Sequence, residues 1–402
     1  MKKKFEYKLL SDAFNNNDIK AGINVLKSKK ITISKITKKF EKFFAKKTGC
    51  KYALMTNSGS SANLLAIAAL TNPLNSKKIP ANSEIIIPAV CWSTSLWPIV
   101  QNNLKPVFVD VDINTFNIDV EKIEKKITKK TKAIMLVHVL GTSTNMKKLL
   151  SLTKKYKLDL IEDTCESLGA TYDKKKLGTF GRFGTYSFYY SHQITSGEGG
   201  MIVCNDTKDY NIIKSLRSHG WSRDTVFHNN FSKKFKELDD RFLFIGPGYN
   251  VRPTEIQSAI AFNQFKRLKK FMNIRNENRN KIINALKKNN KWNNQFEFVK
   301  VDKKIIPSWF GLPILINDKK INKKKFLKKI SSEGIENRPI ISGNFLNQPA
   351  SKFYNFNINK NDFFNSNEIE KRGFFIGLHT KKITQIELKN IAKILLQVRK
   401  NI

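Results

Sequence analysis

Near the middle of the chain, the residues from Tyr186 to Gly200 read YSFYYSHQITSGEGG. A run rich in β-forming residues, Gly184–Tyr190, leads into a polar turn, and a second apolar run, Met201–Cys204, follows that turn. Polar residues held between two buried strands lie at the mouth of a sheet, where α/β enzymes keep their chemistry. His192 stands in the turn, and an imidazole can move protons near neutral pH. We therefore expect this turn to carry the active site.

Upstream of the turn, short apolar runs alternate with helical patterns. The expected strands are Tyr52–Met55, Glu84–Pro88, Pro106–Val111, Ala133–Val139, Leu158–Glu162, Gly184–Tyr190 and Met201–Cys204. Helical stretches lie between most of them, for example residues 62–70, 120–127 and 146–156. The alternation predicts an α/β fold with a mainly parallel sheet, covered by helices on both faces, and ligands at the carboxyl ends of its strands.

The pattern differs on both sides of this alternating block. Residues 1 to 50 show mostly helical, amphipathic spacing, and residues 253–288 read as one or two long helices rich in Lys and Arg. Short strands mixed with helices follow, such as Gly311–Ile316 and Lys323–Ser332. A chain of 402 residues is long enough for two domains. We expect residues 1–255 to form N-terminal helices and a large α/β domain, and residues 256–402 a small C-terminal domain.

Composition restricts the location and the partners of the protein. The hydrophobic fraction of 40% is typical of a globular chain, and no run approaches the about 18 apolar residues that a membrane span needs. The basic start has no long apolar segment behind it, so we expect no signal peptide. Four widely spaced cysteines lack metal-ligand spacing and read as free thiols: Cys50, Cys91, Cys165 and Cys204. We predict a cytoplasmic protein without a metal site or a membrane partner.

The formal charge of +40 raises the question of nucleic-acid binding. The basic residues are spread over the whole length of the chain and occur beside abundant Asn and Ile, rather than in one stripe. A bias of that kind is more simply a compositional habit than a binding surface, so we predict no nucleic-acid partner. The positive field could still assist the encounter with an anionic substrate.

Two polar segments follow expected strands and are candidate parts of the site. The first, Asn57–Ser61, stands between a strand and a helix, where free backbone N–H groups and small residues such as Gly59 and Ser60 allow an anion to approach. The alternative is a serine that only caps the helix. The second contains Asp163, whose carboxylate could pair with a cationic ring nitrogen or, alternatively, cap the next helix.

Three motifs together resemble the sugar aminotransferases of the DegT/DnrJ/EryC1/StrS family, from Thr32 to the carboxyl end. They are the segment around His192, the run LIEDTCESLGA that contains Asp163, and the run GYNVRPTEIQ that contains Asn250. Members of this family are fold-type I enzymes that use pyridoxal phosphate. The resemblance implies a mainly parallel seven-stranded sheet in a large cofactor-binding domain, and a smaller C-terminal α/β domain.

The resemblance also implies roles for residues at matching positions. The cofactor phosphate would be held by Gly59, Ser60 and Ser187, its pyridine nitrogen would meet Asp163, and its ring would stack on Trp92, which is otherwise a half-buried packing residue. Glu166 falls where many relatives carry Gln or His beside the phenolic oxygen. In relatives, the residue at the position of Asn250 reaches the phosphate of the neighbouring subunit, which implies a homodimer with shared sites.

One departure from the family pattern determines the expected reaction. His192 occupies the position of the lysine that holds the cofactor as a Schiff base, and a histidine cannot form that bond. Within the family this exchange marks the sugar 3-dehydratases, of which one kind carries an iron–sulfur cluster on cysteines after the active-site segment. The run from Gly220 to Tyr249 contains no cysteine, so we expect no cluster.

The resemblance assigns further residues to substrates. Arg252 is a candidate clamp for the carboxylate of an L-glutamate cosubstrate, or else part of a structural ion pair. The other candidates, which could equally be ordinary surface polar residues, are expected to face the nucleotide sugar: His219, Arg338 and Asn344.

The expected activity is removal of the C3 hydroxyl from a nucleotide-linked 4-keto-6-deoxyhexose, with GDP-4-keto-6-deoxymannose favoured. Pyridoxamine phosphate would act on the sugar, and glutamate would regenerate it, in a deoxysugar pathway such as that of colitose for O-antigen. Three alternatives stay open at this point: a nucleotide-sugar aminotransferase, a CDP-4-keto-6-deoxyglucose 3-dehydratase, and a cofactor-binding regulatory pseudoenzyme without turnover.

Overall fold

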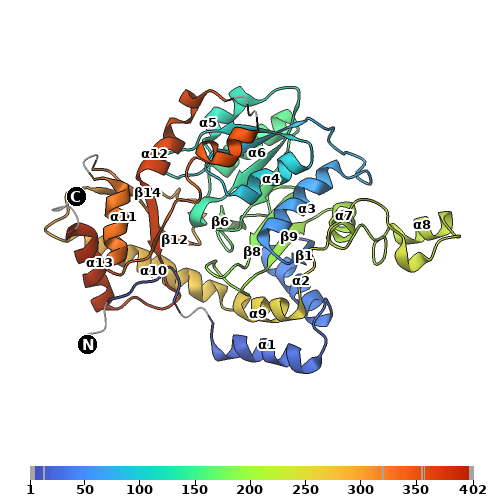
Figure 1. The fold of residues 1–402 in the computed structure, drawn as a ribbon, viewed down its shortest axis with the longest axis horizontal. Coiled ribbons are helices and arrows are strands. Elements are labelled where there is room, and N and C mark those ends of the chain that lie inside the picture. Colours follow the sequence, from blue (N-terminus) through green and yellow to red (C-terminus); the bar gives the residue numbers. More distant parts are fainter. Residues whose placement is uncertain (1–4, 12–13, 319–320, 355, 357, 398–402) are drawn as a thin grey trace.

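The computed structural model describes residues 5–11, 14–318, 321–354, 356 and 358–397 (Figure 1). Its centre is a seven-stranded sheet in the order β1-β9-β8-β5-β4-β2-β3, in which only β9 runs against its neighbours. The strands are β1 (Tyr52–Thr56), β2 (Glu84–Pro88), β3 (Lys105–Val109), β4 (Thr131–Val137), β5 (Asp159–Asp163), β8 (Phe183–Ser187) and β9 (Gly200–Cys204). The predicted α/β fold with a mainly parallel, seven-stranded sheet is therefore confirmed.

Helices cover both faces of this sheet, because its strands are apolar on both sides. In β2, Ile85 and Ile87 pack in the core cluster that contains α3, α4 and α7, whereas Ile86 packs in the cluster that contains α5 and α6. These helices are α3 (Gly59–Thr71), α4 (Ser93–Gln101), α5 (Val120–Ile123), α6 (Met146–Tyr156) and α7 (Thr207–Arg217), with η1 (Glu124–Lys126) and η2 (Val139–Gly141) between them. Near β1 the second face is covered by α2 (Lys35–Thr48) and α9 (Glu255–Phe265).

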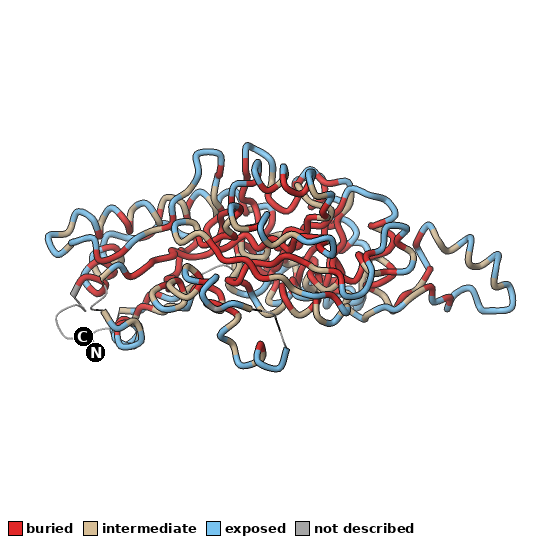
Figure 2. Tube along the Cα trace, turned by 90° about the horizontal axis from the view of Figure 1, so that it is seen from above, coloured by how far each residue is buried: buried red, intermediate tan, exposed pale blue. Residues whose placement is uncertain are grey.

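A smaller unit is built on a four-stranded antiparallel sheet, in the order β10-β12-β14-β13. Its strands are β10 (Phe296–Phe298), β12 (Gly311–Ile316), β13 (Asn337–Pro339) and β14 (Gly373–Gly377). The helices of this part are α10 (Leu268–Lys287), α11 (Lys323–Ser332), α12 (Phe364–Arg372) and α13 (Gln385–Gln397), with η4 (Phe345–Asn347), η5 (Pro349–Phe353) and η6 (Lys360–Phe363). Figure 2 shows one continuous buried layer running through both units. The domain boundary at residue 255 stays a prediction.

Two peripheral parts complete the chain. The ribbon β11-β6-β7 joins β6 (Thr171–Tyr172) and β7 (Lys175–Lys176) to β11 (Ile305–Ile306). An arm with α8 (His228–Lys234) and η3 (Asp240–Phe242) projects from the body at the end far from both termini (Figure 1). At the amino-terminal side, α1 (Asn16–Ser28) packs on α9, where its buried Asp18 accepts hydrogen bonds from Asn263 and Gln264.

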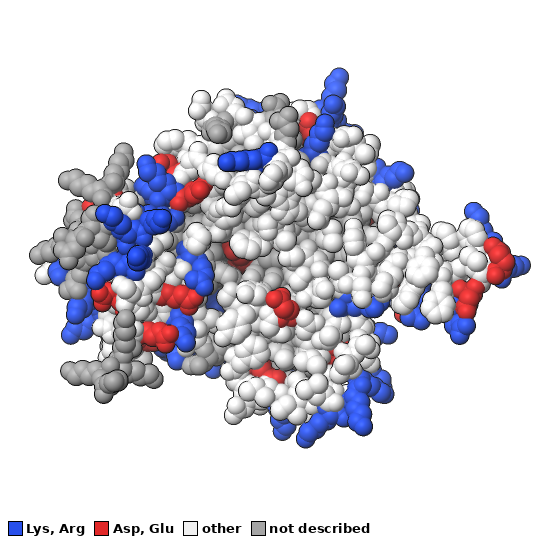
Figure 3. All heavy atoms as spheres, in the orientation of Figure 1, with Lys and Arg blue, Asp and Glu red and all other residues white. Residues whose placement is uncertain are grey.

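The distribution of charged side chains and the length of apolar helices bear on which partners the protein can have. On the face shown in Figure 3, Lys and Arg side chains lie mainly around the edges, and the middle of the face is largely uncharged. Within the described part of the chain, no helix combines the length and apolarity that a membrane crossing requires.

Candidate active site

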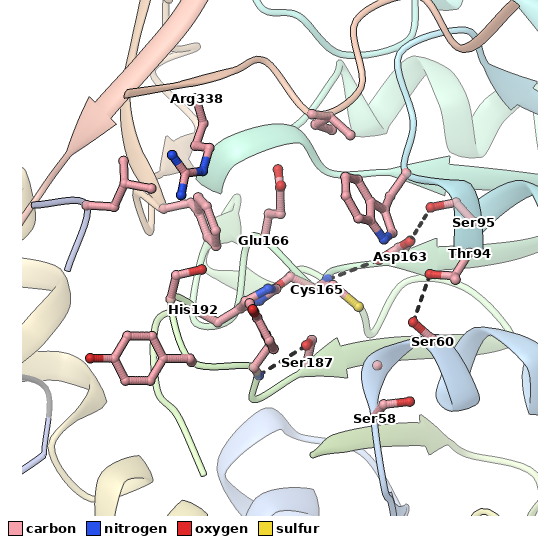
Figure 4. Close-up of a pocket in the computed structure, with 18 of the residues that line it drawn as sticks. Ser58, Ser60, Thr94, Ser95, Asp163, Cys165, Glu166, Ser187, His192 and Arg338 are labelled. Atoms are coloured by element: carbon pink, nitrogen blue, oxygen red, sulfur yellow. Dashed lines mark hydrogen bonds between the residues drawn. The ribbon is translucent and has the colours of Figure 1, made fainter. Parts of the chain in front are cut away.

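A pocket of about 660 Å³ opens at the carboxyl ends of the central strands. Its walls include Asp163 at the end of β5, Ser187 at the end of β8, and the first residues of α3 and α4. Parallel strands bring their carboxyl ends to one edge of the sheet, which is where the sequence placed the site. In Figure 4, His192, Cys165 and Asp163 lie in the middle of the pocket, with Ser58, Ser60 and Ser187 on one side and Arg338 on the other.

The serine turn forms one end of the pocket. Ser58 caps α3, since its Oγ accepts a hydrogen bond of 3.1 Å from the backbone N–H of Ser61. Gly59 begins the helix so close to β8 that a Cβ built on it would lie 2.5 Å from Ser187 Cβ and 2.9 Å from Cys165 Sγ. Ser60 Oγ donates to Thr94 Oγ1 at 3.0 Å. The turn is thus both a helix cap and an exposed helix N-terminus in the pocket, where an anion is stabilised.

Asp163 is a buried carboxylate that ties the two helix starts together. Its Oδ2 accepts from Asn63 Nδ2 at 2.8 Å and from Ser95 Oγ at 2.7 Å, and its Oδ1 accepts from Cys165 N at 3.1 Å. Only 4% of the residue is exposed, and among the described residues it forms no ion pair. Burying a carboxylate without a cation is costly, so this position suits a ligand that brings a positive charge.

One ring nitrogen of His192, Nε2, has no hydrogen-bond partner among the residues that the structure describes. Its Nδ1 lies 2.7 Å from the backbone oxygen of Cys165, and because a carbonyl only accepts, Nδ1 must carry the proton. The lone pair is then left on Nε2. The ring packs edge-on against Phe310, with 5.0 Å between ring centroids. Burial lowers the pKa of His192 to about 4, so the imidazole is neutral at pH 7.

The loop that carries His192 is held from both units. Gln193 Nε2 donates to the carbonyl oxygens of Glu166 and Ser308, the latter at 2.9 Å. Arg275 of α10 donates to the carbonyl of His192 at 3.4 Å. The sequence predicted a strand up to Tyr190, but β8 ends at Ser187. Phe188 N still donates to Gly199 O at 2.8 Å, and the chain then turns, with His192 N donating to Tyr189 O at 3.0 Å. The turn is therefore a braced loop rather than a free one.

Glu166 lies deep in the same pocket. Its Oε2 accepts from Leu140 N at 2.9 Å. Burial raises the pKa of Glu166 to about 7, and the nearby charge of Asp163 acts in the same direction. A carboxyl with this pKa can hold or release a proton near neutral pH, which an ordinary surface glutamate cannot do.

The structure brings together most of the candidate cofactor residues. Gly59, Ser60, Asp163, Glu166 and Ser187 line the pocket together with His192 and Trp92. Trp92 is 56% exposed on the pocket wall, which fits both the stacking role and the half-buried alternative. Asn250 is exposed and pairs with Ser218 in an isolated bridge; it does not line the pocket of its own chain.

Of the four candidate substrate residues, only Arg338 lines the pocket. Its guanidinium pairs with Glu336 at 2.8 Å. His219 and Arg252 lie outside, where both contact Trp221: the imidazole of His219 is 5.1 Å from that ring and the guanidinium of Arg252 is 5.7 Å from it. Asn344 is 2% exposed, because its side chain caps Leu346 N and donates to Asn367.

Sequence reasoning missed several pocket residues. Asn63 and Ser95 lie inside helices and Phe310 directly precedes β12, and nothing local marks them as functional. Lys8, Leu9 and Leu10 come from the amino-terminal segment, more than 300 residues from the strands that hold them. For Ser95, the one available signal was its position near the start of a helix that follows a strand.

The chain belongs to the DegT/DnrJ/EryC1/StrS aminotransferase family, whose sequence profile matches residues 12–396. Among characterised relatives, a GDP-4-keto-6-deoxy-D-mannose 3-dehydratase of Escherichia coli is 39% identical, over 95% of this chain and 96% of that protein.

Solved structures agree with this assignment. The E. coli GDP-4-keto-6-deoxy-D-mannose-3-dehydratase with bound hydrated PLP is similar with a TM-score of 0.89 at 37% identity, over 98% of this chain and all of that one. A GDP-4-keto-6-deoxymannose-3-dehydratase with a trapped PLP-glutamate geminal diamine has the same TM-score and identity, over 97% of this chain and all of that one.

Proposed function

We propose that this protein is a pyridoxal phosphate-dependent 3-dehydratase of nucleotide sugars, with GDP-4-keto-6-deoxymannose as substrate. The observation that carries the proposal is His192, a neutral imidazole with a free Nε2 at the centre of the pocket, in the position where the family's aminotransferases have lysine. Relatives of this name match almost the full length of the chain.

The pocket fits the cofactor in its charge distribution. The N-terminus of α3, with Gly59 pressed against Ser187, provides small residues and N–H groups for a phosphate. Asp163, buried without a cation among the described residues, provides the carboxylate that a protonated pyridine nitrogen needs. Trp92 is exposed at the pocket wall and offers a face on which the ring can stack.

When bound, the cofactor supplies an amine for the C4 ketone of the sugar and a ring that accepts electrons. The protein then has to move protons. His192 Nε2 would accept the proton released from the C4′ carbon of the bound cofactor, and the imidazolium would donate it to the C3 hydroxyl oxygen. The electron pair left by the C4′–H bond would break the C3–O bond, so that the oxygen leaves as water. The bond from Nδ1 to the Cys165 carbonyl keeps the ring in one orientation through both transfers.

Glutamate serves as the second substrate and restores the amine of the cofactor after each turnover. The relative trapped with a PLP-glutamate adduct supports this assignment. The product would feed the synthesis of a 3,6-dideoxyhexose such as colitose for a cell-surface polysaccharide, in the cytoplasm. The four cysteines are free thiols, as is usual in a reducing compartment.

We further propose a homodimer with shared active sites. Asn250, His219 and Arg252 lie outside the pocket of their own chain, and the arm that follows His219 exposes Phe242 and Phe244 by more than half. Large exposed apolar side chains on a projecting arm are typical of a surface that another chain covers. Light scattering at assay concentration tests the oligomeric state, and a fully active monomer would contradict this proposal.

Product analysis tests the proposed activity. The protein is incubated with GDP-4-keto-6-deoxymannose, pyridoxal phosphate and glutamate, and the products are analysed by mass spectrometry. We expect a 3-deoxy keto sugar and ammonia. An amino sugar would identify an aminotransferase, and no conversion of this or of the CDP-linked substrate would identify a pseudoenzyme.

A further inference from the structure

The amino-terminal segment is built into the pocket. We call residues 5–10 the strap. It runs along the small sheet, where Tyr7 N donates to Gly334 O at 2.7 Å and Glu336 N donates to Tyr7 O at 2.9 Å. These bonds pair the strap with the residues that lead into β13. The strap therefore adds an outer strand-like segment to the small unit.

Tyr7 and His379 lock the strap in place. The Tyr7 side chain is fully buried, stacks on the imidazole of His379 with 4.2 Å between centroids, and donates from its hydroxyl to Gly377 O at 3.2 Å. His379 Nε2 donates to Lys8 O at 2.7 Å. A Cβ on Gly377 would lie 2.3 Å from Lys8 O, so the absence of a side chain there lets the strap approach. The backbone of Lys8 is fixed, while its side chain stays free to turn.

The strap places a lysine in the active-site wall. Lys8 lines the pocket, its side chain is 60% exposed, and within the described part of the chain its ion pair is an exposed one with Glu6, at 3.4 Å. Among the described residues, the Lys and Arg side chains that line the pocket are Lys8 and Arg338. Glu336 connects them, because one of its oxygens accepts from Leu9 N at 3.0 Å and the other pairs with Arg338.

We propose that Lys8, carried by the strap, binds the diphosphate of the nucleotide sugar beside Arg338, which the family resemblance already assigns to the nucleotide sugar. This inference rests on the proposed function and adds the group that recognises the substrate. Figure 4 shows Arg338 across the pocket from Ser58, Ser60 and Ser187. The serine end suits the phosphate of the cofactor, so the cations at the other end are available for a second oxyanion.

Two anionic groups could use these cations, the diphosphate and the carboxylates of glutamate. The diphosphate carries two negative charges on adjacent phosphates, which two separate side chains can share. The diphosphate also lies several bonds from the reacting carbons of the sugar. Arg338 lies correspondingly on the side of the pocket away from Ser58, Ser60 and Ser187, and Lys8 lines the same pocket. The α-carboxylate of glutamate must instead lie beside the amine that reacts. The diphosphate is therefore the better match.

Binding of GDP without turnover tests the subsite. Isothermal titration measures the affinity for GDP of the pyridoxal phosphate-loaded protein and of three variants: Lys8→Ala, Lys8→Arg and Lys147→Ala. We expect Lys8→Ala to weaken GDP binding about tenfold, the effect of one charge-assisted contact at a partly exposed site. Lys8→Arg should retain most of the affinity. Lys147, an exposed residue of α6 away from the pocket, is the matched control and should match the parent.

Two further measurements separate the possible anions. Raising the salt concentration should weaken GDP binding more steeply in the parent than in Lys8→Ala, because one screened attraction is missing in the variant. Single-turnover reaction with glutamate, followed by cofactor absorbance, should be unchanged in Lys8→Ala, as should the affinity for pyridoxal phosphate.

The outcomes distinguish this inference from the proposed function. Equal GDP affinities in the parent and in Lys8→Ala would overturn the subsite, and so would a loss confined to the glutamate reaction or to cofactor binding. If the parent itself binds neither GDP nor CDP, the proposed function fails instead. Among the described residues the Lys8 side chain pairs with the exposed Glu6 alone, so its removal should leave the fold intact.

Discussion

Glu166 allows a quantitative test of the site's electrostatics. Burial raises the pKa of this carboxyl from 4.5 to about 7 in the folded protein. Between these two values the folded protein binds a proton that the unfolded chain has lost, so stability is full below pH 4.5 and declines as the pH rises to about 7. The difference between the pKa values corresponds to about 3 kcal/mol. For a chain of 402 residues this is about 3 °C in Tm.

The substitution Glu166→Gln should remove this decline in stability with rising pH. Glutamine has nearly the same shape, carries no charge to bury, and can still accept the hydrogen bond from Leu140 N. Relative to the parent, the cofactor-free variant should gain about 3 °C in Tm on going from pH 4 to pH 8. Scanning calorimetry measures both proteins across this range, and Glu297→Gln, which changes an exposed carboxylate, is the control. Parallel pH profiles for the parent and the Glu166 variant would refute the reasoning.

Three other predictions follow from the site. Gly59→Ala should lower the free energy of unfolding by about 1–3 kcal/mol and weaken pyridoxal phosphate binding, since the added Cβ meets Ser187. Calorimetry and equilibrium dialysis check these two effects, and unchanged values would contradict the prediction. Mixing and refolding inactive His192→Asn and Asn250→Ala chains should restore activity, because one site of each hybrid dimer would be intact; no recovery in hybrids of proven composition would count against shared sites. The purified protein should contain no iron and should not respond to added iron, and stoichiometric iron with cluster absorbance would contradict this.

Much of the fold could be predicted because its signals are local. For four elements the predicted first and last residues agree with the structure. These are the apolar strands β2 and β12 and the amphipathic helices α6 and α11. Helix α3 begins at Gly59, three residues before the predicted Ala62, because Ser58 caps it and the small residues that follow carry no apolar pattern. Strand β8 ended earlier than expected, since pairing rather than composition stops it at Ser187.

The candidate site could be predicted only in part, for a physical reason. Asp163, Ser187 and His192 follow strands that share one edge of the sheet, so chain order was enough to bring them together. Lys8 reaches the pocket through contacts to Gly377 and His379, and no local pattern encodes a contact over that separation. Asn344 looked available in sequence, yet its amide is used by the helical turn that it caps.

Replacing His192 tests the central claim most directly. In His192→Asn the residues of the cofactor seat remain, so the affinity for pyridoxal phosphate should stay within about twofold of the parent, but the imidazole that we assign to the proton transfers is gone. We expect loss of the C3 hydroxyl from GDP-4-keto-6-deoxymannose, measured by mass spectrometry in a single turnover, to slow at least about 100-fold. If the asparagine variant forms the 3-deoxy sugar at nearly the parental rate, His192 is not the group that moves the protons.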